Sequence, residues 1–394
     1  MKQHAVLTAF LVLILSTTDG MARVKLITLP TRQRVEVQLD HPNATLVEEE
    51  RIVPLVMGVN EVDFSWVGTT IDPGTIVFRV LGPIEGRNLD VKVLSVSYPP
   101  GENSLLWQIF SSNSGSVRVR ISYLLSGLEK GFNYRAVVKH DESALTLSQF
   151  IRVKNFAGEW FGDSSIHAGY GGHFTKPIGL NETKEMLLEK VSQIPVVKTY
   201  TAGAAVFGYL DQSKGKLNVP MHYVIVNDAA HNLGQKPLPQ GKVRIFQKDA
   251  ADTTAFLGED WGQFTPIDEQ MRLYLGLAQD VTVRRTIGRQ EHHRVAGNLK
   301  HLDVVVKYEI ENFKDSEITL RIVEDLNRLG QEAGRGGGGR GLEWVLAEST
   351  TFNRLETVET NAQQLTLLAD LPARKGTKGT KIVHELHIQF RNEW

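Results

Sequence analysis

The chain of 394 residues contains no cysteine, carries almost no net charge and has only one extended apolar run. The absence of cysteine excludes disulfides, thiolate catalysis, zinc sites built on cysteine and lipid attachment to a cysteine. The 44 basic and 45 acidic side chains balance, so the overall charge does not predict binding to nucleic acid or to an anionic membrane surface. We therefore expect a protein held together by its apolar core, with no nucleic-acid partner.

The first 22 residues have the composition of an export signal. Lys2 supplies a basic start, Ala5–Leu15 is an apolar run of eleven residues, and Ser16–Ala22 is small and polar. Eleven apolar residues are too few for a bilayer span, which needs roughly 20. We predict cleavage after Ala22, or after Gly20, with an uncleaved signal anchor as the alternative. No second run of comparable length follows, so no transmembrane segment is expected after cleavage.

Beyond this leader, apolar and polar residues alternate over many short stretches. Examples are residues 35–39, 117–123, 304–310 and 318–322. A period of two with one polar face is typical of antiparallel strands that lie on a core on one side and face water on the other. Such sheets pack face to face in pairs. The sequence therefore predicts an all-β protein built from β-sandwich-like domains.

A turn-rich segment divides the chain into two expected domains. Ser126–Gly131 combines glycine, serine and charged residues, as linkers and turns do. We predict a first β-sandwich-like domain over residues 23–126 and a larger one over 127–394.

Two segments interrupt the strand pattern of the larger domain. Residues 159–203 form an expected insertion, and within it Glu182–Val191 carries good helix formers after Asn181, a plausible N-cap. We predict one short helix there. The run Gly334–Gly341 lacks the Gly-Lys-Ser/Thr ending of a phosphate loop, so we expect a flexible linker between two strands.

Part of the chain resembles a known bacterial family. The segments that carry the resemblance are Asn227–Asp228, Pro237–Asp249, Leu257–Arg285 and Tyr308–Leu326, with Trp344–Thr350 and Leu365–Phe390 compatible as terminal strands. Over roughly residues 126–394 the chain is similar to the family whose domain of unknown function is numbered 4139. The resemblance implies an exported protein with an all-β, sandwich-like domain, and it supplies no activity, cofactor or catalytic residues.

The insertion also holds the candidate metal ligands Asp163, His167 and His173. Two imidazoles and a carboxylate are a ligand set of zinc enzymes, but spacings of four and six residues match no familiar zinc pattern. Solvated loop residues are the more ordinary interpretation. Gly162–Ser165 is similar to the surroundings of some hydrolase serines, but no partner base is evident, and a turn with a solvated serine pair is the better account.

Other polar residues have ordinary structural interpretations. We expect His292 and His293 to lie at a solvated strand end and one of Arg284 and Arg285 to face water. His384 falls on the apolar face of its strand, where a backbone carbonyl is the expected partner, and His387 falls on the opposite face.

These observations favour a non-catalytic binding or scaffolding module of the cell envelope, located in the periplasm or outside the cell. An envelope protein or a second copy of the chain is the expected partner, and no cofactor is expected. The alternative is a metal-assisted hydrolase that uses Asp163, His167 and His173.

Overall fold

The computed structural model is almost entirely β-structure, which confirms the predicted all-β class. It describes residues 25–393 apart from 42, 85–88, 171, 204–214, 298, 336–341, 353 and 357–362. The expected leader and most of the glycine-rich run lie outside the described residues. Among the described residues, no helix has the length and apolar character needed to cross a membrane.

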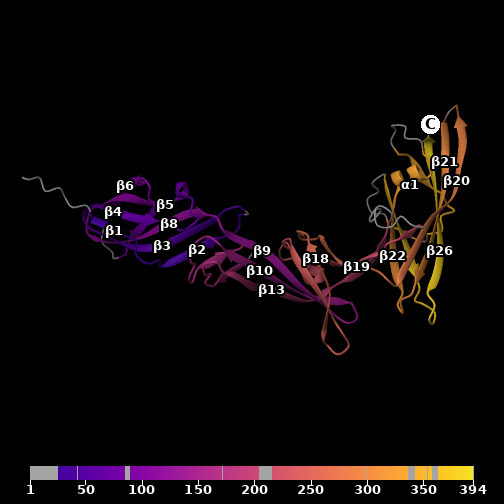
Figure 1. The fold of residues 1–394 in the computed structure, drawn as a ribbon, viewed down its shortest axis with the longest axis horizontal. Coiled ribbons are helices and arrows are strands. Elements are labelled where there is room, and N and C mark those ends of the chain that lie inside the picture. Colours follow the sequence, from indigo (N-terminus) through magenta and orange to yellow (C-terminus); the bar gives the residue numbers. More distant parts are fainter. Residues whose placement is uncertain are drawn as a thin grey trace, which may run out of the picture. The chain divides into compact units, whose positions relative to one another are not determined.

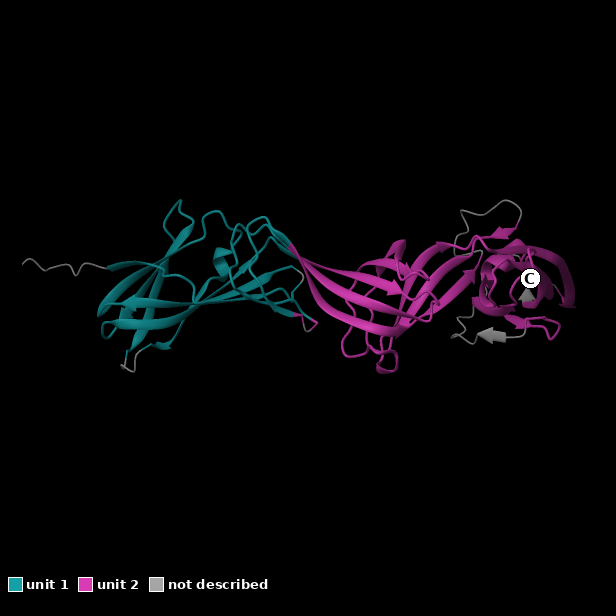
Figure 2. Cartoon of the chain, turned by 90° about the horizontal axis from the view of Figure 1, so that it is seen from below, with its two compact units in different colours: residues 1–129, 154–169, 173–183 teal, residues 130–153, 170–172, 184–394 magenta. Residues whose placement is uncertain are grey.

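The described chain forms two compact units, shown in teal and magenta in Figure 2. Unit 1 contains residues up to Glu129 together with 154–169 and 173–183, and unit 2 contains the rest. The sequence predicts residues 159–203 as an insertion in the larger domain. In the structure, residues 159–169 and 173–183 of this insertion belong to unit 1. The physical reason is strand pairing: Ser165–His167 pairs with Arg34–Gln38 of the first unit.

Unit 1 contains two sheets (Figure 1). In spatial order, the first consists of β1 (Lys25–Thr28), β4 (Gly58–Ser65), β7 (Ser104–Ser111) and β6 (Val91–Ser97). The second consists of β12 (His173–Thr175), β11 (Ser165–His167), β2 (Arg34–Gln38), β3 (Thr45–Leu55), β8 (Gly115–Leu125) and β5 (Val77–Pro83). A short 3-10 turn at Pro73–Thr75 precedes β5.

Aromatic rings join the facing surfaces of these two sheets. The Phe64 ring of β4 lies 5.9 Å from the Tyr123 ring of β8, and the Trp107 ring of β7 lies 4.7 Å from Phe78 of β5. The predicted apolar positions of β8 are buried, because alternate residues of a strand face the same side. This packing makes unit 1 a β-sandwich.

Unit 2 contains three sheets. The first consists of β13 (Thr183–Pro195), β10 (Ala144–Asn155), β9 (Leu128–Val138), β17 (Gly241–Lys248) and β18 (Thr254–Gly262). The second consists of β19 (Gln270–Leu277), β16 (Pro220–Val226), β14 (Val197–Ala202), β22 (Ile318–Asp325), β25 (Gln364–Leu371) and β24 (Arg354–Glu356). The third consists of β15 (Lys216–Leu217), β20 (Val281–Ala296), β21 (Leu299–Asn312), β26 (Thr380–Glu393) and β23 (Trp344–Leu346).

The second and third sheets of unit 2 share one apolar core. The alternating residues predicted to face inward, including Val304 and Val306 of β21 and Leu320 and Ile322 of β22, are buried in it. The same core receives Leu326 and Leu329 of α1 (Leu326–Glu332). Burial of these branched side chains is the main favourable free energy of this part of the fold.

Several neighbouring strands are parallel rather than antiparallel as predicted. They are β1 with β4, β11 with β2, β17 with β9, and β14 with β22. Parallel neighbours need a long connection, and each of these pairs is separated by many residues in the sequence. Alternation along one strand carries no information about the direction of its neighbour, so the sequence pattern could not distinguish the two arrangements.

The predicted helix over Glu182–Val191 is wrong, because Thr183–Pro195 forms strand β13 beside β10. Residues with high intrinsic helix propensity adopt the strand conformation here because pairing to a sheet overrides a weak local preference. The α-helix that the structure does describe is α1, which begins after Asp325. The Asp325 carboxylate caps it by accepting a hydrogen bond from the backbone N–H of Arg328 at 2.9 Å.

A buried ion pair links the two sheets that share the unit 2 core. The Arg285 guanidinium on β20 donates to the Glu324 carboxylate on β22 at 2.7 and 3.0 Å, and Tyr308 on β21 also donates to Glu324. Burial, followed by the nearby charge of Glu324, raises the pKa of Tyr308 well above its usual value, so the phenol keeps its proton. Arg284 is the exposed member of the pair, as predicted, whereas Arg285 is 9% exposed.

Replacing Arg285 by methionine leaves Glu324 buried without its cation. Removing one partner of a buried ion pair typically costs about 3–5 kcal/mol. We expect Arg285→Met to lower the free energy of unfolding by that order in urea denaturation. Arg284→Met is the matched control on the opposite face, and its effect should stay within about 0.5 kcal/mol. Equal effects of the two substitutions would contradict the proposed role of the ion pair.

His384 on β26 has the backbone-carbonyl partner that the sequence predicted. Its Nδ1 lies 3.2 Å from the carbonyl oxygen of Thr351, and its ring stacks on Phe352 at 4.6 Å. Burial lowers the pKa of His384, while the Thr351 hydrogen bond acts in the opposite direction. The folded state therefore holds the imidazole in its neutral form at a pH where the unfolded chain already takes up a proton.

Acidification should therefore destabilise the fold through His384. As pH falls through the unfolded value of about 6.5, protons bind preferentially to the unfolded chain, and stability is lost. We expect the fall in unfolding free energy between pH 7.5 and pH 5.5 to be smaller in His384→Gln than in the native chain. Identical slopes for the two proteins would show that His384 does not contribute.

Candidate functional site

Unit 1 contains an open cavity of about 470 Å³, which we call the Trp160 pocket. Its walls include Arg32, Arg34, Arg51, Trp160, Asp163 and Ser164. Ligand pockets typically have volumes of roughly 300–1,000 Å³, so the cavity is large enough for a small molecule or for one group of a larger partner.

The pocket forms where two parallel strands begin. Arg34 is the first residue of β2 and Arg32 lies two residues before it, and residues 160–164 lead directly into β11, which pairs in parallel with β2. Parallel neighbours start at the same edge of a sheet, so the segments that precede them meet there. Arg51 reaches this edge from β3, the other neighbour of β2.

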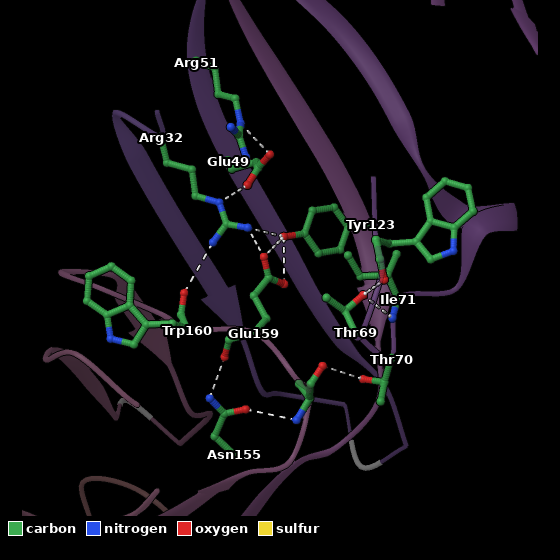
Figure 3. A network of polar contacts seen from close by, with 12 residues as sticks. Arg32, Glu49, Arg51, Thr69, Thr70, Ile71, Tyr123, Asn155, Glu159 and Trp160 are labelled. Atoms are coloured by element: carbon green, nitrogen blue, oxygen red, sulfur yellow. Dashed lines mark hydrogen bonds and ion pairs between the residues drawn. The ribbon is translucent and has the colours of Figure 1, made fainter. Parts of the chain in front are cut away.

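A network of charges joins the arginines of the pocket wall to two buried carboxylates (Figure 3). Arg32 forms ion pairs with both Glu49 and Glu159, and the Arg51 Nε donates to Glu49 at 2.8 Å. Glu49 is fully buried and Glu159 is 8% exposed. Charges this deeply buried are tolerated only when they are paired and hydrogen-bonded, so Arg32 holds β3 and residue 159 in fixed positions.

Two neutral side chains complete this network. The Tyr123 hydroxyl lies 3.1 Å from each carboxylate oxygen of Glu159, and burial, followed by the charge of Glu49, raises the pKa of Tyr123. The phenol therefore stays protonated and donates to Glu159. Asn155 orders the same turn by donating to the Glu159 carbonyl at 2.8 Å and accepting from the Ala157 N–H at 3.0 Å.

Trp160 presents its indole to solvent at the pocket wall. Its side chain is 61% exposed, while its backbone carbonyl accepts a hydrogen bond from Arg32 at 3.4 Å. The ring lies against Gly162, where an added Cβ would come within 2.9 Å of the ring carbons. A residue without a side chain at 162 therefore allows the indole to adopt this position.

Ser164 supplies a buried polar atom with no partner. Its side chain is fully buried and, within the described part of the chain, its hydroxyl makes no hydrogen bond. Buried polar groups are nearly always hydrogen-bonded to protein or to water. The Ser164 hydroxyl is therefore a buried polar group at the pocket wall that these contacts leave unsatisfied.

The structure brings together two of the three predicted metal ligands. His167 on β11 and His173 on β12 are cross-strand partners with ring centroids 4.7 Å apart. Asp163 lies instead in the wall of the Trp160 pocket. Among the described residues, no three His, Cys, Asp or Glu side chains are grouped so that they could hold a metal ion.

Ser165 and His173 form a serine–histidine pair in the same hairpin. The Ser165 Oγ lies 2.8 Å from the His173 Nε2, within reach of a proton transfer. Nucleophilic catalysis also requires a group that orients the histidine and donors that stabilise an oxyanion. Within the described residues, no carboxylate bonds to the other ring nitrogen of His173, so the pair is an exposed cross-strand contact.

One of the two predicted solvated histidines of unit 2 lies at a second, smaller cavity. His293 on β20 is exposed, and its Nε2 lies 2.8 Å from the Asp303 carboxylate. Both line a hollow of about 310 Å³ on the outer face of the third sheet. His292 is also exposed, as expected for this end of β20.

Sequence reasoning did not identify Arg32, Glu49, Glu159 or Trp160. One signal was present: Val47 and Val53 on β3 face the core, and Glu49 and Arg51 occupy positions of the same parity between them. A charge at an inward position of an alternating strand indicates a buried pair. Its partners, Arg32 and Glu159, could not be identified because they are distant in the sequence.

Comparisons with known proteins do not assign the chain to a family. No protein-family model matches it, and no curated protein matches it either. The resemblance to the family of domain 4139 therefore stays a prediction, and the function must be argued from the site itself.

The buried charges make a direct prediction about stability. We expect Glu49→Ala to destabilise unit 1 by about 3–5 kcal/mol, because Arg51 and Arg32 lose a buried counter-charge. Glu48→Ala on the same strand is the control, since Glu48 faces the other side and its contact with Arg120 is 4.0 Å long. Hydrogen exchange of the β2, β3 and β8 amides measures the loss of stability in unit 1 separately from unit 2. Unchanged protection in Glu49→Ala would rule out this role.

Proposed function

We propose that this chain is a non-catalytic binding module of the cell envelope and that the Trp160 pocket is its binding site. The observation that carries the proposal is an exposed indole and several polar groups placed around a cavity by a buried ion network. Binding sites commonly combine a preformed hollow with a few polar groups on rigid elements.

Rigidity of the pocket favours binding. Arg32 bonds to groups on two segments, namely β3 through Glu49 and residues 159–160 through the Glu159 carboxylate and the Trp160 carbonyl. The wall residues therefore need little reordering when a ligand arrives, which reduces the entropy lost on association.

Binding is favoured over catalysis by the arrangement of reactive groups. Asp163 and Ser164 line the pocket, whereas His173, bonded to Ser165, lies on the neighbouring hairpin. A hydrolase needs nucleophile, base and oxyanion donors around one reacting atom. The described groups at the pocket can form hydrogen bonds to a ligand, but they do not place a nucleophile, a base and oxyanion donors around one atom.

The proposed location rests on the sequence of the leader. Its apolar run of eleven residues is too short to span a bilayer and is followed by small residues suited to cleavage. Export would place the chain in the periplasm or outside the cell, among envelope proteins and other copies of itself.

Photocrosslinking in native cells tests the proposal. A photoreactive amino acid at Gln33, an exposed wall residue, should form a reproducible adduct with an envelope component that mass spectrometry identifies. The control position is Lys92 on β6, an exposed residue of unit 1 that does not line the pocket. Identical adducts at both positions, or none at 33, would refute binding at the pocket. An adduct of twice the chain mass would identify a second copy as the partner.

A further inference from the structure

The charge balance of the Trp160 pocket restricts what it can bind. The Arg32 guanidinium is paired with Glu49 and Glu159, both carboxylates being nearly or fully buried. An anion that competed for Arg32 would leave Glu159 buried without a cation and Glu49 with Arg51 as its remaining partner, which is unfavourable.

The other two arginines of the wall are also paired. Arg51 donates to Glu49 at 2.8 Å, and Arg34 pairs with Glu36 on its own strand. Asp163 adds a further carboxylate to the wall. The wall therefore carries no surplus positive charge, and a strongly anionic ligand such as a phosphate or a polyanion does not fit it.

The wall is equally unsuited to a purely apolar ligand. Thr31, Gln33 and Asp163 supply hydrogen-bond donors and acceptors to the wall. Covering these groups with hydrocarbon would remove them from water without replacing their hydrogen bonds. The occupant must carry groups that both donate and accept.

Trp160 adds a flat apolar surface to this polar wall. Its indole is 61% exposed, and its contact with Gly162 sets its position. An exposed ring of this size gains free energy by covering a matching apolar face at little cost in side-chain entropy. The pocket therefore combines a ring platform with hydroxyl, amide and carboxylate groups.

We propose that the Trp160 pocket binds a neutral saccharide, an inference that rests on the proposed binding function. A sugar ring has one face of C–H groups that can stack on the indole, and its hydroxyls both donate and accept. The Asp163 carboxylate accepts from such hydroxyls, and the amide of Gln33 serves either role. The cavity of about 470 Å³ lies within the range of small-ligand sites.

Calorimetric titration of the full mature chain with neutral oligosaccharides tests the inference. The probes are oligomers of glucose, galactose, mannose and N-acetylglucosamine, together with a uronic-acid oligomer as the anionic comparison. We expect saturable binding of at least one neutral oligomer. The Trp160→Ala and Asp163→Asn variants should weaken it at least tenfold.

Trp261→Ala is the matched control. Trp261 is a comparably exposed indole, 56% against 61%, but it lies on β18 of unit 2 and outside the pocket. It should leave saccharide affinity unchanged. Circular dichroism confirms that each variant remains folded, which is expected because both indoles are largely exposed.

The outcomes separate this inference from the proposed function. No saturable binding of any neutral oligomer, tighter binding of the uronic-acid oligomer, or equal losses in Trp160→Ala and Trp261→Ala would each overturn saccharide recognition. The photocrosslinking at residue 33 would still decide whether the pocket binds another envelope component. Neutral-saccharide binding that depends on Trp160 and Asp163 supports both saccharide recognition and the proposed binding function.

Discussion

The ion pairs of Arg32 with Glu49 and Glu159 are the constraint on which the pocket of unit 1 depends. They join β3 to a segment more than a hundred residues later in the chain, which then enters β11 beside β2. Because neither carboxylate has access to enough water to remain charged alone, the two segments must stay together in the folded state. The ion pairs that the buried carboxylates require therefore set the position of the pocket wall.

The same chemical arrangement occurs in both units. In unit 1 an arginine pairs with Glu159, which also accepts from Tyr123, and in unit 2 Arg285 pairs with Glu324, which also accepts from Tyr308. A carboxylate has more acceptor sites than one arginine fills, so a buried tyrosine hydroxyl satisfies the remainder. In each case the three side chains come from separate segments of the chain and hold those segments together. The network of unit 1 lies beside an open cavity, whereas the Arg285 network lies within a shared core.

Much of the architecture followed from periodicity. Residues such as Val119 and Ile322 lie on the buried sides of their strands because a period of two allows only two faces, and only one can be apolar. The position of the helix could not be predicted from periodicity. Residues 183–195 are a strand because β10 lies beside them, and α1 depends on a cap by Asp325 and on core contacts of Leu326. Pairing and packing outweigh the small differences in local propensity.

The sequence by itself determined the all-β class and the alternation of buried and exposed residues, including the inward position of His384 on its strand. Each of these depends only on neighbours along the chain. Tertiary structure alone decided that Arg32 meets Glu159, that Trp160 and Asp163 share a pocket wall with Arg51, and that β2 and β11 run parallel. These contacts join residues far apart in the sequence, and an alternating pattern specifies the face of a residue but not its partner on that face.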